Sequence, residues 1–179
     1  MLDRAKTIRF EQTVLPHLGA AYNLARWLIR NDQDAEDVVQ EAYLRALRFF
    51  DGYQGGDSRC WLLTIVRNTC YSWLQRNHNR EQTTLFDEEI HSDTTGDPEV
   101  ELQLLQQADI ELLKRSLAEL PDEFREVIVL RELEGLSYKE IADVSNIPLG
   151  TVMSRLARAR KQLHQCLTRR AGKEVGYGL

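Results

Sequence analysis

The sequence lacks the features that mark membrane-spanning and secreted proteins. No apolar run approaches the ~18 residues that a membrane span needs, so we expect no direct membrane insertion. The N-terminal segment MLDRAKTIRFEQ has no apolar stretch and is not typical of a signal peptide. Together these two absences predict a cytoplasmic protein.

Cysteine is scarce, and its placement argues against a metal site. The three cysteines, Cys60, Cys70 and Cys166, show no C-x-x-C spacing and no neighbouring histidine pair, so we expect no zinc and no other metal. Buried reduced thiols are the favoured interpretation, and a redox role for Cys60 or Cys166 is the alternative. We find no nucleophile–base pair, and the segment GYQGGD lacks the lysine of a P-loop. The sequence therefore predicts no enzyme, no cofactor and no small-molecule substrate.

Charge is sorted into blocks along the chain. Residues 81–101 contain eight acids and no Lys or Arg, and removing these charges from the net −5 leaves +3 for the rest. Residues 153–173 carry seven Lys or Arg and residues 58–80 carry four Arg, in both cases without an acid. Residues 31–44 carry five acids and no base. Blocks of opposite sign suggest different partners.

Helical spacing dominates and strand signals are nearly absent, so we expect an all-α fold. Apolar residues recur every three to four positions from Phe10 to Ile29 and predict a first helix. Asp34 is the expected N-cap of a second helix, which carries an apolar stripe to Phe50. The glycine-rich segment DGYQGGDS then breaks the pattern, and a third helix is expected from about Arg59 to Asn77.

An acidic segment divides the chain. Residues 81–101 have few apolar residues and predict a flexible linker of low intrinsic order. Helical periodicity returns near Val100, Leu120-Pro121 separates two helices, and Gly135 ends the second of them. We therefore expect two small helical domains, residues 1–80 and 102–172, joined by this linker and followed by a disordered tail at 173–179.

The segment LSYKEIADVSNIPLGTVMSRLARARKQL has the layout of a helix-turn-helix. Ser137 and Glu140 match a capping box, and Asn146 at the corner tolerates left-handed backbone. The second helix of such a motif enters the major groove with its N-terminus first. A basic helix with a solvated face is the alternative, since cations favour helix C-termini. The apolar face of the second helix is expected to hold Val152, Leu156, Ala159 and Leu163.

The third expected helix also has two sides. Trp61 and Trp73 fall on the apolar side and are expected in the core. The polar side mixes basic, amide and aromatic groups, which suits single-stranded nucleic acid, and the preceding glycine-rich loop could accept an extruded base. Considered alone, this helix fits an ordinary solvated face equally well. The polar residues are Arg67, Asn68, Tyr71, Gln75 and His78.

The second expected helix begins with acidic residues. Its first turns hold Asp34, Glu36, Asp37 and Glu41. Matching of the helix macrodipole explains part of this pattern. Acids without a nearby cation also leave an anionic patch beside Gln40 and Leu44, on which a basic protein surface could dock.

Three segments in this order resemble a bacterial sigma factor: DAEDVVQEAYLRA, WLLTIVRNTCYSWLQR and LPDEFREVIVLRELEGLSYKEIADVSNIPLGTVMSRLARAR. The short two-domain layout resembles the extracytoplasmic-function (ECF) group of the sigma-70 family, over about residues 8–168. The resemblance implies a transcription initiation factor that binds core RNA polymerase, directs it to promoters through −35 and −10 elements and helps to open the −10 DNA. A helix-turn-helix regulator with an N-terminal sensing or dimerisation domain is the alternative.

The resemblance also implies roles for residues. Core polymerase contacts are expected from Asp34, Asp37, Gln40, Glu41 and Leu44. Contacts to the unpaired −10 strand are expected from Arg59, Arg67, Asn68, Tyr71, Gln75 and His78. Major-groove and phosphate contacts at the −35 element are expected from Gly150, Thr151, Met153, Ser154, Arg155, Arg158 and Lys161. Met153 stands where some relatives carry arginine, so base readout is expected to shift to Ser154, Arg158 or an apolar contact with a thymine methyl.

Two further expectations follow from the resemblance. The acidic linker resembles the family's linker, which threads polymerase channels that nucleic acid would otherwise occupy, and we expect the free chain to bind DNA poorly because this linker covers basic surfaces. The resemblance also implies an anti-sigma factor as a partner, for which exposed apolar surface at Leu44 or Leu149 could serve.

Overall fold

The computed structural model describes residues 3–78 and 98–175, and every regular element within these ranges is helical. The all-α prediction is confirmed. Most of the predicted linker lies outside the described residues, so its proposed effect on DNA binding does too. The N-terminal domain holds α1 (Arg4–Val14), α2 (Leu18–Ile29), α3 (Asp32–Phe49) and α4 (Ser58–Arg76). The C-terminal domain holds α5 (Pro98–Glu119), α6 (Asp122–Ile128), α7 (Tyr138–Ser145) and α8 (Leu149–Val175).

Three expected boundaries differ in the structure. The first expected helix is two helices, α1 and α2, separated by the 3₁₀ turn η1 (Leu15–His17), because Pro16 has no N–H to continue the hydrogen-bond ladder. The N-cap of α3 is Asn31 rather than Asp34, since its side-chain oxygen accepts the Asp34 N–H at 2.9 Å. Helix α8 continues to Val175, past the expected start of the tail at 173, because no proline interrupts it.

The glycine-rich break between α3 and α4 is packed rather than open. After the 3₁₀ turn η2 (Phe50–Gly52), the Tyr53 ring stacks on Phe50 and lies 4.9 Å from the Trp61 ring, centroid to centroid. The Tyr53 hydroxyl donates to the Gly56 carbonyl at 2.9 Å. Gly56 has φ +95°, a conformation that favours glycine. This turn therefore fixes the direction in which α4 starts.

Local signals in the C-terminal domain act as predicted. The Ser137 side chain accepts the Glu140 N–H at 3.1 Å, and the Glu140 carboxylate accepts the Ser137 N–H at 2.6 Å, which completes the capping box. Asn146 adopts φ +53° at the corner, and Gly135 adopts φ +69°. The helix that Gly135 was expected to end is less regular than predicted, since α6 passes into a π-helical turn, η3 (Val129–Leu133).

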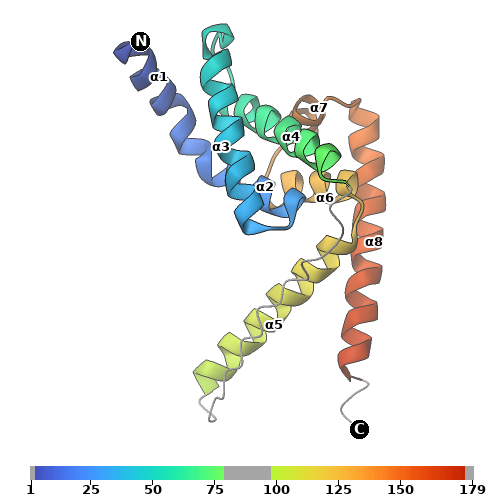
Figure 1. The fold of residues 1–179 in the computed structure, drawn as a ribbon. Helices are drawn as coiled ribbons and strands as arrows, with labels where there is room; N and C mark the ends of the chain where they lie inside the picture. The colour runs from blue at the N-terminus through green and yellow to red at the C-terminus, as the bar shows by residue number, and fades with distance from the viewer. Residues whose placement is uncertain (1–2, 79–97, 176–179) are drawn as a thin grey trace.

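The two domains share one continuous buried core. Helix α6 lies between the N-terminal helices and α8 (Figure 1) and contacts both α2 and α8. Every residue from Phe124 to Leu130 is buried, including the charged Arg125 and Glu126. Arg125 is satisfied within its own domain, because its guanidinium donates to the carbonyl oxygens that end α5, among them that of Leu117 at 2.8 Å.

Among the described helices, we find none that combines the length and the hydropathy required to cross a membrane.

Candidate nucleic-acid interface

Helix α8 begins at a tight corner that fixes its direction. The Ala142 carbonyl accepts the Ile147 N–H at 3.1 Å, and the Pro148 carbonyl accepts the Thr151 N–H at 3.0 Å. Helix α8 packs on α6, and the apolar residues expected on its inner face are buried, apart from the half-buried Leu163. The opposite side of the helix therefore faces outward, as the sequence predicts. The fully buried residues are Val152, Leu156 and Ala159.

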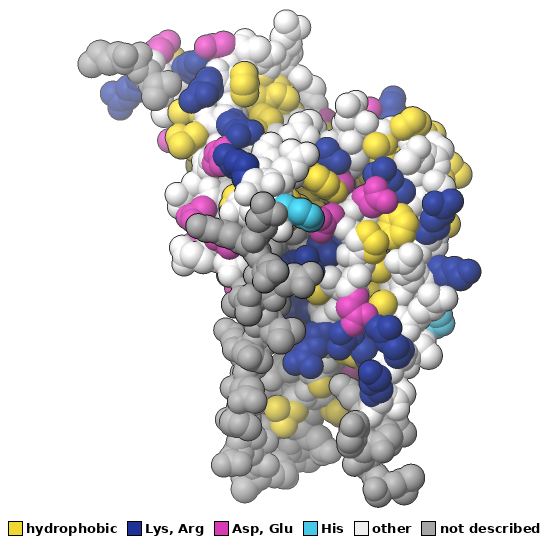
Figure 2. Space-filling view, turned by 45° about the vertical axis from the view of Figure 1, so that its right-hand side comes forward, with side chains coloured by type: hydrophobic (Ala, Val, Ile, Leu, Met, Phe, Trp, Pro, Cys, Tyr) yellow, Lys and Arg dark blue, Asp and Glu magenta, His cyan; other side chains and the backbone are white. Residues whose placement is uncertain are grey.

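The outer side of α8 is exposed and basic. Gly150, Met153, Ser154, Arg158 and Lys161 are exposed, and Thr151 is half-buried. Lys and Arg side chains are spread over this face of the molecule, with hydrophobic side chains between them (Figure 2). Within the described residues, we find no ion pair for Arg158 or Lys161, so both cations are free to meet an anionic partner.

Two other cations of α8 are engaged inside the domain. Arg155 is half-buried and lies 3.3 Å from the Glu123 carboxylate. Arg160 donates to the Glu132 carboxylate at 2.7 Å. Arg155 must leave Glu123 before it can bind another anion, whereas the exposed pair of Arg160 with Glu132 is worth little.

The polar side of α4 is only partly exposed, which differs from the prediction. Asn68, Gln75 and His78 are exposed. Arg59, Arg67 and Tyr71 are half-buried, because two glutamates of the C-terminal domain hold them. The sequence predicts the polar side of this helix, but its pattern carries no information on the domain that covers that side.

The first of these glutamates is Glu126 on α6. Its side chain is fully buried, and it accepts hydrogen bonds from Arg67 Nε at 2.7 Å, Tyr71 Oη at 2.6 Å and Ser145 Oγ at 2.7 Å. Burial and the Glu126 charge raise the pKa of Tyr71 above its usual range, so the phenol keeps its proton and donates. Burial lowers the pKa of Arg67, but the Glu126 carboxylate outweighs it and leaves that pKa raised.

The second glutamate is Glu134, which follows η3. Its carboxylate accepts from Asn23 Nδ2 at 2.6 Å and from Arg59 Nη2 at 3.3 Å, and Arg59 also donates to its backbone carbonyl. Glu134 thus holds α2 and α4 together against the C-terminal domain. Its side chain is only 10% exposed, which strengthens the pair with Arg59 relative to a surface ion pair.

A polar cleft of about 540 Å³ separates the two candidate DNA-binding elements. One wall is formed by α4 and includes Thr64 and Asn68, and the other includes Asn146 and Arg155 at the helix-turn-helix corner. Both candidate surfaces therefore border one cleft in this closed arrangement, by which we mean the two domains in contact through Glu126 and Glu134.

The acidic side of α3 is less anionic than predicted. Asp37, Gln40 and Leu44 are exposed, with Leu44 at 63%, whereas Asp34 and Glu41 are half-buried. The expectation that no cation lies nearby is wrong. Arg45 and Arg76 lie 2.5 and 3.3 Å from the Glu41 carboxylate, and Arg26 lies 2.9 Å from that of Asp32. These cations come from α2, α4 and the next turn of α3, which the packing brings together.

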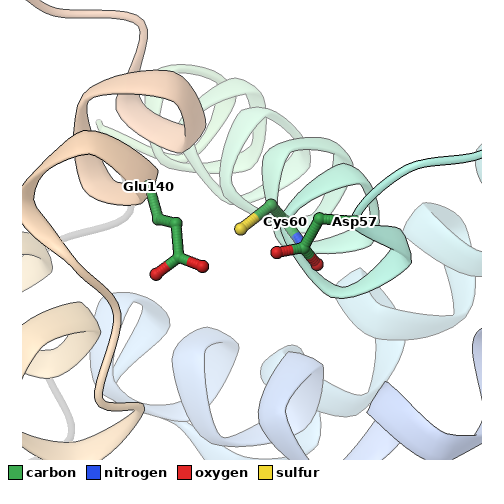
Figure 3. Close-up of side chains that lie close together, drawn as sticks. All are labelled: Asp57, Cys60 and Glu140. Carbon is green, nitrogen blue, oxygen red and sulfur yellow. The ribbon is translucent and has the colours of Figure 1, made fainter.

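Asp57, Cys60 and Glu140 meet where α4 faces α7, with their side-chain oxygen and sulfur atoms within 4.8 Å of one another (Figure 3). Burial, followed by the Asp57 carboxylate, raises the pKa of Cys60 to about 12, so its thiol stays protonated at neutral pH. Both carboxylates already cap helices, Asp57 at α4 and Glu140 at α7. The cluster is explained by capping, and we assign no metal to it.

Neither Glu126 nor Glu134 was among the site residues predicted from the sequence. Glu126 lies on a helix that reads as amphipathic, with the carboxylate opposite the apolar stripe, so the pattern places it in solvent. The sequence offered no signal for its burial, because the expected helix ran from Pro121 to Gly135 and the 7-residue length of α6 appears only in the structure.

Comparisons with known proteins agree with this architecture. The Sigma-70 region 2 family model matches residues 13–80, and the Sigma-70, region 4 model matches residues 110–163. The chain is 34% identical over 172 residues to the ECF RNA polymerase sigma factor SigE of Mycolicibacterium smegmatis, which covers 96% of this chain and 66% of that protein. It is 35% identical over 137 residues to the ECF RNA polymerase sigma-E factor of Escherichia coli K12, covering 73% and 72% respectively.

Two solved structures are also similar. The sigma factor RpoE, in complex with the anti-sigma factor NepR from Bartonella quintana, is 30% identical with a TM-score of 0.68, over 89% of this chain and 97% of that chain. CnrH, in complex with the cytosolic domain of CnrY, is 27% identical with a TM-score of 0.59, over 89% and 88%. In both cases the similarity extends over most of this chain.

Two small helical domains, one with an outward-facing helix-turn-helix, are typical of a DNA-binding protein that acts in transcription. Because region 2 and region 4 both match in order, and relatives of similar layout are ECF sigma factors, the chain belongs to the ECF group of the sigma-70 family and is a transcription initiation factor. A regulator with an N-terminal sensing domain is not favoured, since residues 13–80 match region 2.

Proposed function

We propose that this chain binds core RNA polymerase, directs it to promoters through −35 and −10 elements, and helps to open the −10 DNA. The observation that carries the proposal is the exposed basic face of α8, where Arg158 and Lys161 have no ion pair among the described residues, in a chain whose other domain matches sigma region 2. The chain carries out no chemistry of its own, and its work is recruitment followed by strand capture. We place this work in the cytoplasm.

The −35 element is read by α8. The N-terminal turn of a recognition helix points at base edges, and residues further along meet phosphates. The exposed Ser154 and Arg158 suit base edges, and Met153 suits a thymine methyl. The full set is Gly150, Thr151, Met153, Ser154, Arg155, Arg158 and Lys161.

The unpaired −10 strand is held by α4. Asn68, Gln75 and His78 are exposed in the closed arrangement, whereas Arg59, Arg67 and Tyr71 become free only when the domains separate. Opening base pairs costs ~1.4 kcal/mol of stacking per step. Binding to polymerase and to both promoter elements offsets this cost. Because the linker joins the two DNA-binding domains, binding of the first raises the effective concentration of the second at its promoter element.

Polymerase and an anti-sigma factor are the proposed protein partners. Polymerase docks on the acidic side of α3 through Asp34, Asp37, Gln40, Glu41 and Leu44. One similar structure holds a sigma factor bound to an anti-sigma factor, and another holds CnrH bound to the cytosolic domain of CnrY, which supports a regulator of that kind for this chain. The exposed Leu44 and Leu149, at 63% and 49%, offer it apolar contacts.

A reconstituted transcription reaction tests the proposed function. Overproducing the chain in cells and mapping the new transcription start sites supplies a promoter. Core polymerase plus this chain should start transcription there with no other sigma factor. A requirement for a second sigma factor would favour the regulator instead.

Within that reaction, Asn68→Ala is expected to reduce promoter opening about tenfold while closed-complex binding changes less than about twofold, since one lost hydrogen-bonded base contact is worth roughly 1–3 kcal/mol. Asn68 is exposed, so its removal should not disturb folding. Permanganate footprinting measures opening, and filter binding measures the closed complex. Gln12→Ala, an exposed amide on α1, is the matched control. Equal loss at both steps would contradict the strand-capture role.

A further inference from the structure

Glu126 is a charged side chain with no exposed surface, and its contacts come from both domains. Ser145, in its own domain, supplies one hydrogen bond. Arg67 and Tyr71, in the other domain, supply the rest. A buried carboxylate is tolerated only when it is paired and hydrogen-bonded. Glu126 therefore has full compensation only while the two domains are in contact.

The donors that α4 offers to Glu126 form a geometry that also fits a phosphate. The Arg67 guanidinium lies over the Tyr71 ring, 4.1 Å from its centroid, so the guanidinium N–H groups and the phenol O–H converge on one point. The guanidinium fork matches carboxylate and phosphate alike. Arg67 Nη1 also donates to Asn68 Oδ1 at 3.3 Å, which orients the neighbouring amide at the edge of the cleft.

We propose that Arg67 and Tyr71 form a phosphate-binding subsite for the unpaired promoter strand, and that the Glu126 carboxylate occupies this subsite in the free chain as an internal substitute for that phosphate. The inference rests on the proposed function of α4. It adds that Arg67 and Tyr71 bind a phosphate of the strand, and that Glu126 excludes this phosphate in the free chain. Strand and Glu126 compete for the same hydrogen bonds, so the strand binds only after the domains separate.

The exchange explains how a closed free chain becomes an open bound one. When a strand phosphate replaces the carboxylate, Arg67 and Tyr71 keep an anionic acceptor, while Glu126 keeps Ser145 and gains water. Without a strand, separation leaves Arg67 with the Asn68 amide and water, and Tyr71 with water, so neither has an anionic acceptor. The remaining free energy of separation comes from two sources. Polymerase binds to α3, and α8 binds to the −35 duplex.

Binding of a single strand by the full-length free chain tests the proposal. The probe is a fluorescent single-stranded oligonucleotide of mixed sequence, because phosphate contacts are independent of sequence. Fluorescence anisotropy at low salt should show that Glu126→Gln binds at least about tenfold more tightly than the wild type. Ser145→Ala removes only the contact within the C-terminal domain and should change binding less than about twofold.

Further variants keep the outcome decisive. If circular dichroism shows that Glu126→Gln does not fold, Glu126→Asp takes its place. Aspartate retains the charge but has a shorter side chain that reaches Arg67 and Tyr71 less well, so this variant should also bind the strand more tightly. Adding Arg67→Ala to the tightened variant should abolish the gain. If the folded Glu126 variants bind the strand with wild-type affinity, the proposal is overturned. The proposed function would still stand in that case if Arg67→Ala impairs promoter opening by the polymerase-bound chain. If Arg67→Ala altered neither opening nor the gain, the strand-binding role of this face would fail as well.

Discussion

Replacing Arg158 and Lys161 with alanine is expected to lower the affinity of the polymerase-bound chain for −35 duplex DNA about 100-fold or more. Both side chains are exposed and have no ion pair among the described residues, so no described carboxylate has to release them before DNA binds. Each lost base or phosphate contact costs roughly 1–3 kcal/mol, and ~1.4 kcal/mol is a factor of ten. Fluorescence anisotropy with the polymerase complex measures the affinity.

The salt dependence separates the two kinds of contact. If both residues meet phosphates, the slope of log affinity against log salt should fall by about 1.8, from ~0.9 per phosphate. Arg169→Ala is the matched control, because Arg169 lies about three turns beyond Arg158 on α8 and is paired with Glu119, and it should weaken binding less than about threefold. A double variant that binds the duplex as tightly as Arg169→Ala would show that α8 does not read the −35 element through this face.

The double change Gln40→Ala and Glu41→Lys is expected to weaken binding to core polymerase by about 100-fold. The substitution removes an exposed amide and reverses a charge beside the exposed Leu44. Loss of interface anchors costs 2 kcal/mol or more each, and like-charge contact with a basic partner adds to that loss, on the order of several kcal/mol. Surface plasmon resonance with immobilised core polymerase measures the affinity.

The new lysine would also lie beside Arg45 and Arg76, the present partners of Glu41. A thermal unfolding curve is therefore part of the same experiment, and it should show a folded domain with modestly reduced stability. Glu11→Lys makes the same charge change on the exposed side of α1 and should leave polymerase affinity within about twofold. Equal affinities for a folded double variant and this control would remove α3 as the docking surface.

The helix-turn-helix could be predicted from sequence because its determinants are local. Ser137 and Glu140 lie three positions apart and satisfy each other, and Asn146 needs only its own backbone freedom to turn the chain. The outer face of α8 followed from the positions of its apolar residues. The break at Pro16 is equally local. It was not predicted, because the apolar spacing is helical on both sides of Pro16 and indicated one continuous helix.

The contacts between domains could not be predicted because charge patterns do not distinguish surface from interface. Arg67 and Glu126 each lie on the polar side of a helix, where a solvated charge is the ordinary expectation. Only the packing of α6 against the N-terminal helices turns them into a buried pair. The role of α4 as a strand-binding face stays a prediction, and the structure adds that half of its candidate residues are held by the other domain in the closed arrangement.

In the free chain the two domains are closed through Glu126 and Glu134, and we infer that they separate when polymerase and promoter bind. The most direct test is the distance between spin labels on Arg48 of α3 and Gln162 of α8, both exposed, in a chain whose three cysteines are replaced by alanine. Double electron–electron resonance should give one narrow distance for the free chain and a longer one in the polymerase–promoter complex. The same distance in both states would contradict the claim.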